Sequence, residues 1–116
     1  MQDTMSPLTK LEAAFSETSD VYVNAGVDPA AYYAQLTGSI RQHICTPYQV
    51  NAIVREPGFP DAAVGTTISG QCVAQMDGYW LVYQPEQDRF CCFWGQDSNN
   101  LGAHGVCGSP LYCWSA

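Results

Sequence analysis

Residues 66–94 decide the fold, and they read TTISGQCVAQMDGYWLVYQPEQDRFCCFW. Asp77-Gly78 is a dipeptide that favours a two-residue hairpin turn, and apolar segments flank it on both sides. A second turn of four residues follows at Pro85 to Asp88. The stretch therefore predicts consecutive antiparallel strands over residues 66–76, 79–84 and 89–94.

The sequence before this meander predicts one more strand and two helices. Residues 48–54 alternate between the two sides of an extended chain, which is typical of a strand. Ser6-Pro7 and Asp28-Pro29 are helix starts, each with a capping side chain before a proline. Thr46-Pro47 ends the second helix, because the residue before a proline is pushed out of the helical region. The apolar stripes at helical spacing are Leu8, Leu11 and Phe15 in the first helix, and Tyr33, Leu36, Ile40 and Ile44 in the second.

The C-terminal segment reads as a loop. Residues 95–110 contain four glycines and the pair Asn99-Asn100, and residues 111–115 are apolar enough for a short last strand. We therefore predict a single α+β domain over residues 1–116, in which two N-terminal helices pack on an antiparallel β-meander of about four strands. Residues 1–47 are expected to be mainly helical, and residues 48–116 to form the sheet with its long C-terminal loop.

Charge excludes several classes of function. The chain of 116 residues is 47% hydrophobic and carries 11 acidic against four basic residues, for a net charge of −7. Four cationic side chains cannot neutralise a run of phosphates, so nucleic-acid binding is excluded and anionic membrane surfaces are disfavoured. No apolar run is long enough to span a membrane. The partners that remain are other protein chains, as copies of this chain or as different proteins.

The six cysteines predict disulfide staples in an oxidising compartment. They are Cys45, Cys72, Cys91, Cys92, Cys107 and Cys113. An even number, concentrated near the C-terminus, favours pairing over free buried thiols, which remain the alternative. The expected location is therefore extracytoplasmic: secreted, at the cell surface, in a periplasm or in an oxidising organelle lumen.

The predicted strand register determines the face of the sheet to which each cysteine side chain points. Cys91 and Cys92 are adjacent on one strand, so their side chains point to opposite faces and each needs a different partner. Pairing Met76 with Tyr79 across the hairpin places Cys72 opposite Tyr83, on the same face as Cys92. We expect Cys107 to bond to Cys113, and Cys45 to tether the second helix to the sheet.

No constellation of catalytic residues is evident. The carboxylates are scattered singly, and the nearest Cys–His combinations are close neighbours in sequence, which seldom form catalytic dyads. A zinc site is one alternative, but no Cys-x2-Cys knuckle is present. We therefore expect a non-enzymatic protein without a cofactor or a resident metal. The candidate zinc ligands are Cys92, His104, Cys107 and Cys113.

Aromatic residues are the most informative functional feature. Both faces of the predicted meander are apolar, whereas an antiparallel sheet usually keeps one face in water. Either the segment from Gln96 to Pro110 covers the second face, or another chain does. The predicted partner-binding residues are Trp80, Phe93, Trp94 and Trp114. The leading hypothesis is a structural or accessory subunit of a larger complex or filament; the alternatives are a secreted small-ligand or glycan-binding module and a zinc-binding domain.

Overall fold

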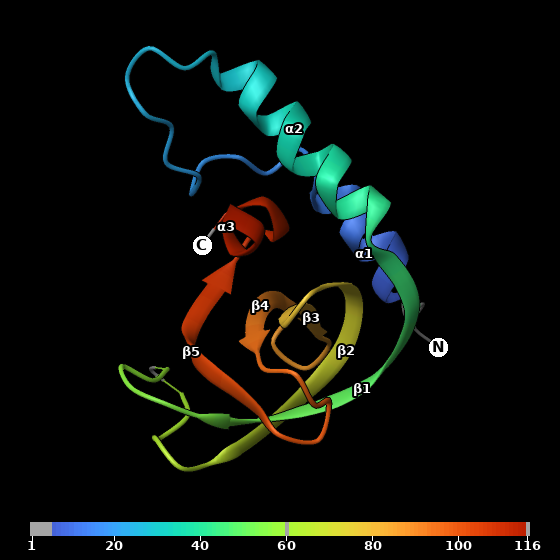
Figure 1. Ribbon diagram of the computed structural model, residues 1–116, viewed down its shortest axis with the longest axis vertical. Helices are drawn as coiled ribbons and strands as arrows, with labels where there is room; N and C mark the ends of the chain where they lie inside the picture. The colour runs from blue at the N-terminus through green and yellow to red at the C-terminus, as the bar shows by residue number, and fades with distance from the viewer. Residues whose placement is uncertain (1–5, 60, 116) are drawn as a thin grey trace.

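The strands of the sheet close on themselves to form a barrel. The computed structural model describes residues 6–59 and 61–115, and within them five strands form the barrel while three helices lie on one side of it (Figure 1). The strands follow each other around the barrel in sequence order: β1 (Ile44–Val54), β2 (Thr67–Met76), β3 (Tyr79–Gln84), β4 (Arg89–Trp94) and β5 (Leu101–Gly108). Consecutive strands pair antiparallel, and β5 closes the barrel by pairing parallel with β1. The predicted α+β class is confirmed, with one strand more than expected.

The additional strand is β5, in the segment predicted to be a loop. Glycine is depleted from strands in general, and this segment is rich in it. Here glycine permits close approach between backbones: a methyl carbon added at Gly105 would overlap the carbonyl oxygen of Gly58. The prediction of a loop was therefore wrong, because it took a residue needed for barrel closure as a sign of irregular structure.

The C-terminal residues form a helix rather than the short strand that was predicted. Helix α3 (Pro110–Ser115) begins at a proline, and the backbone N–H of Tyr112 donates to the hydroxyl oxygen of Ser109 at 3.2 Å. This helix lies between α2 and the barrel (Figure 1). The described part of the chain therefore holds three helices, where the sequence predicted two.

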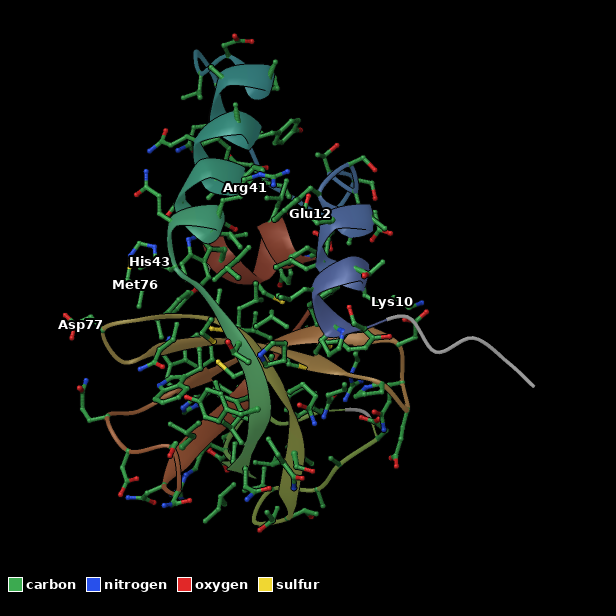
Figure 2. All side chains as sticks on the ribbon, turned by 90° about the vertical axis from the view of Figure 1, so that its right-hand side faces the viewer. Lys10, Glu12, Arg41, His43, Met76 and Asp77 are labelled. Carbon is green, nitrogen blue, oxygen red and sulfur yellow. The ribbon has the colours of Figure 1, made fainter. Side chains whose placement is uncertain are left out.

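Both N-terminal helices begin at the predicted residues. The hydroxyl of Ser6 accepts a hydrogen bond from the N–H of Thr9 at the start of α1 (Pro7–Ala14), and Asp28 precedes α2 (Pro29–Gln42). A salt bridge of 2.8 Å between Arg41 and Glu12 links the two helices (Figure 2). Among the described residues, no helix combines the length and apolar character needed to cross a membrane.

The register of β2 differs from the prediction at one point. Met76 pairs with Tyr79, as predicted, but Cys72 pairs with Val82 instead of Tyr83 because the ladder is irregular between Cys72 and Ala74. A shift of one residue moves a side chain to the other face of a sheet. Cys72 therefore points into the barrel, away from the face that carries Cys92.

Barrel closure gives each face of the sheet its own core. The inner core fills the barrel and consists of Val50, Ala52, Val54, Phe59, Cys72, Trp80, Val82, Cys91, Phe93, Leu101 and Ala103. The outer core lies between the barrel and the helices and consists of Leu11, Ala14, Val21, Leu36, Ile40, Val73, Ala74, Leu81, Tyr83, Phe90, Cys92, Leu111, Cys113 and Trp114. Both apolar faces are thus covered within one chain, and the segment after Gln96 provides the strand that completes the inner core.

Candidate functional site

Three of the four predicted partner-binding residues lie inside the protein itself. Phe93 is 0% exposed, Trp80 4% and Trp114 7%. The indole N–H of Trp80 donates to the carbonyl oxygen of Gly95 at 2.8 Å, and that of Trp114 donates to the hydroxyl of Ser39 at 2.9 Å. These three side chains therefore stabilise the fold, and a surface that contacts a partner protein must lie elsewhere on the molecule.

Trp94 is the fourth predicted contact residue, and it is half-buried at the end of β4. Its ring meets those of Tyr79 and His104 edge-on, with centroids 5.6 Å and 5.5 Å away. His104 is itself exposed. Trp94 therefore contributes to a small aromatic cluster near the barrel surface, but it does not form a broad apolar patch.

All six cysteines are free thiols in the structure. The predicted staples are absent, including the bond between Cys107 and Cys113. Cys107 packs against the inner core, whereas Cys113 lies in the outer core. The expectation that Cys91 and Cys92 point to opposite faces is met, since Cys91 belongs to the inner core and Cys92 to the outer core. Barrel closure and the irregular register of β2 together change which thiols face each other.

Most of these thiols are poor nucleophiles. Burial raises the pKa of Cys91 and of Cys92 to about 12, and it raises the pKa of Cys72 and Cys113 well above the usual thiol range. The thiolate is the reactive form of cysteine, and at neutral pH these four residues hold almost none. Cys45 and Cys107 are only half-buried, so they are the thiols that reagents reach first.

The candidate zinc ligands are not brought together. Cys92 and Cys113 lie in the outer core and Cys107 packs against the inner core. His104 is exposed, with Nδ1 3.2 Å from the carbonyl oxygen of Glu56. Across residues 6–59 and 61–115, no three His, Cys, Asp or Glu side chains are grouped so as to hold a metal ion.

A hollow of about 430 Å³ lies beside α1, and four of the charged residues that line it, Lys10, Asp20, Asp88 and Arg89, already have partners. Lys10 Nζ lies 3.1 Å from a carboxylate oxygen of Asp88. The Asp20 carboxylate accepts hydrogen bonds from the backbone N–H of Ser109 at 2.8 Å and from its hydroxyl at 2.6 Å. Hydrogen bonds from Tyr83 and Lys10 hold the pKa of Asp88 below its usual range. These contacts fasten α1 and the following loop to the barrel, so we assign them a structural role.

A second hollow, of about 190 Å³, has a different character. Tyr22, Asn24, Val27, Tyr32 and Ser115 line it, and none of these side chains is charged. Tyr22 is 78% exposed and Val27 43%, in the loop that leads to α2. We call these five residues the Tyr22 surface. It brings the loop after α1, the first turn of α2 and the end of α3 together.

Comparisons of the chain with protein-family models, curated proteins and solved structures returned no match. The fold and the Tyr22 surface are therefore interpreted from their own geometry.

The Tyr22 surface was not predicted from the sequence, although two of its residues stand out there. Tyr22 and Val27 are large apolar residues that lie beyond the apolar stripe of the first helix, in a segment broken by Asn24 and Gly26.

Proposed function

We propose that this protein is a non-catalytic structural subunit that assembles with other protein chains, and first of all with copies of itself, through the Tyr22 surface. Tyrosine offers a large contact area at low cost in side-chain entropy, and it is enriched among the residues that dominate protein interfaces. The observation that carries the proposal is the 78% exposure of Tyr22 beside an uncharged hollow.

Charge supports a second copy of the chain as the occupant. A binding site for a strongly charged partner would present charges of the opposite sign, and the Tyr22 surface presents none. Two copies related by a two-fold axis would each place Tyr22 against the hollow of the other, as a self-complementary interface requires. The net charge of −7 would oppose non-specific association and keep the free subunit in solution.

The other part of the proposal concerns location. We place the working subunit outside the cytoplasm, because the sulfur atoms of Cys45 and Cys72 lie only 3.8 Å apart and an oxidising compartment would favour their pairing. This assignment is independent of the Tyr22 surface, so either can fail without the other.

Replacing Tyr22 by alanine is the direct test of the interface. We expect the wild-type protein to self-associate with rising concentration, and Tyr22→Ala to raise the Kd of self-association by at least about 30-fold, the size of an interface hot spot. Sedimentation velocity over a wide concentration range measures this. Circular dichroism should be unchanged, because Tyr22 is exposed and contributes little to either core.

The matched control is Tyr48→Ala. Tyr48 is also an exposed tyrosine, at 40%, but it lies on β1 and not on the Tyr22 surface. Its replacement should leave self-association within about twofold of wild type. A wild-type protein that stays monomeric at every concentration would exclude self-assembly, and equal effects of both variants would exclude this surface as the interface.

Salt dependence is a second expected property of self-association. Each copy carries −7, so the copies repel each other at long range, and salt screens this repulsion. We therefore expect the Kd to fall as NaCl rises from about 0.01 M to about 0.15 M, where the screening length falls from about 30 Å to about 8 Å. Sedimentation equilibrium at fixed pH measures the trend, and a Kd that rises with salt would indicate an interface held by ion pairs.

A further inference from the structure

We propose that Cys45 and Cys72 are the pair of thiols that form a disulfide when the protein is oxidised, fastening the start of β1 to β2. Their sulfur atoms lie 3.8 Å apart, and Cys45 Sγ is also 3.6 Å from the carbonyl oxygen of Cys72. This inference concerns covalent modification and does not depend on the proposed self-assembly.

The local backbone suits closure of this bond. The ladder between β1 and β2 is irregular between Ile44 and Tyr48, so Cys45 lies in a bulge, while Cys72 pairs with Tyr48 just beyond it. A disulfide has a sulfur–sulfur distance of about 2.05 Å, so the two sulfur atoms must approach by about 1.8 Å. Rotation of the two side chains and adjustment of the bulge provide this movement without displacing the regular part of either strand.

The two thiols have different access to an oxidant. Cys45 is half-buried, whereas Cys72 is 0% exposed. With oxidised glutathione, the Cys45 thiolate attacks one glutathione sulfur and releases the first glutathione thiolate. Burial raises the pKa of Cys72, so loss of its proton limits the second step. The Cys72 thiolate then attacks the Cys45 sulfur of the mixed disulfide and releases the second glutathione thiolate. Two thiols lose two protons and two electrons, and oxidised glutathione becomes two molecules of glutathione.

Cys91 and Cys107 are the strongest competing pair, because they are register partners across β4 and β5. The Cys91 thiol, however, donates to the side-chain oxygen of Gln84 at 3.2 Å. The Cys45 and Cys72 sulfur atoms, in contrast, are already in contact with each other. We therefore assign oxidation to the pair on β1 and β2.

Tryptic peptides distinguish the two assignments directly. Cleavage after Arg41, Arg55 and Arg89 yields peptides 42–55 and 56–89, which contain Cys45 and Cys72 as their single cysteines. The other four cysteines all fall in peptide 90–116. After incubation of the folded protein with oxidised glutathione and blocking of free thiols, mass spectrometry without reduction should find 42–55 joined to 56–89. Either peptide joined to 90–116, or both recovered unlinked, would overturn the proposal.

Thermal unfolding gives an independent measurement of whether the disulfide between Cys45 and Cys72 has formed. The two cysteines are 27 positions apart, and closing a loop of that length should raise Tm by about 10 °C in the oxidised over the reduced protein. Cys45→Ser should abolish this gain while the reduced variant still folds, because Cys45 is only half-buried. The matched control is Cys107→Ser, at another half-buried strand cysteine, which should retain both the gain and the linked peptides. A gain that survives in Cys45→Ser and disappears in Cys107→Ser would assign the bond to Cys107 and refute the proposal.

Discussion

Replacing Phe93 by alanine should lower the free energy of unfolding by about 3–5 kcal/mol. Phe93 is 0% exposed and is among the largest fully buried side chains of the inner core. Truncation removes its transfer free energy and leaves a cavity that a closed barrel cannot easily collapse. Since small domains are stable by only about 5–15 kcal/mol, this loss is a large share of the total. Urea unfolding followed by tryptophan fluorescence measures it.

Phe15→Ala is the control for this variant. Phe15 is half-buried, and its ring lies 4.7 Å from the guanidinium carbon of Arg41, so its loss should cost about 1 kcal/mol. The comparison also tests the sequence-based interpretation that Phe93 contacts a partner. If Phe93→Ala kept wild-type stability and instead weakened self-association, the partner contact would be supported and the core assignment would be wrong.

The local parts of this fold could be predicted because local signals determine them. Asp77-Gly78 forms the expected hairpin turn with φ values of 35° and 83°, as the type I′ geometry of such turns requires. The register of β3 against β4, from Gln84 opposite Arg89 to Leu81 opposite Cys92, follows from the length of the turn between them. The starts of both N-terminal helices could also be predicted, from a polar residue that precedes a proline. The Asp28 side chain makes no capping hydrogen bond, however, and α2 ends at Gln42, before the predicted end at Thr46-Pro47, because β1 begins at Ile44.

The closure of the barrel could not be predicted in the same way. The pairing of β1 with β5 joins Ala52 to Leu101, two residues far apart in sequence and with no turn between them to fix their register. Closure also decides what the aromatic residues do. In an open meander, Trp80 and Phe93 would lie on an uncovered face, and in the barrel they fill the interior. The bulge that turns Cys72 inward likewise has no signature in the spacing of the residues.

The candidate site could not be predicted from the sequence for a related reason. The Tyr22 surface joins side chains from α2, from α3 and from the loop between α1 and α2. Ser115 reaches it only because residues after Pro110 form a helix, where the sequence favoured a strand. The contact between Cys45 and Cys72 likewise depends on two irregular positions in the ladders of the sheet. Both sites are products of tertiary structure and not of a motif.

Barrel closure itself can be tested at Gly105. This residue of β5 has φ of +93°, and a methyl carbon added to it would overlap the Gly58 carbonyl oxygen and lie 3.1 Å from its carbonyl carbon. The left-handed backbone costs a non-glycine residue about 1–2 kcal/mol, and separating the two backbones adds about 1–3 kcal/mol. Gly105→Ala should therefore lower the free energy of unfolding by about 3 kcal/mol or more. The neighbouring contact, in which Arg55 N–H donates to the carbonyl oxygen of Ala103 at 2.7 Å, should weaken with it.

Gly65→Ala separates the cost of the left-handed backbone at Gly105 from the cost of moving the two backbones apart. Gly65 has the same φ of +93°, but an added methyl carbon would meet no atom within 4 Å. This variant carries the backbone strain alone, so it should cost about 1–2 kcal/mol. The difference between the two variants in urea unfolding then measures how tightly β5 is held against the segment at Gly58. A difference below about 0.5 kcal/mol would mean that this approach is not tight in solution, and that the glycines of β5 serve turn geometry instead of barrel closure.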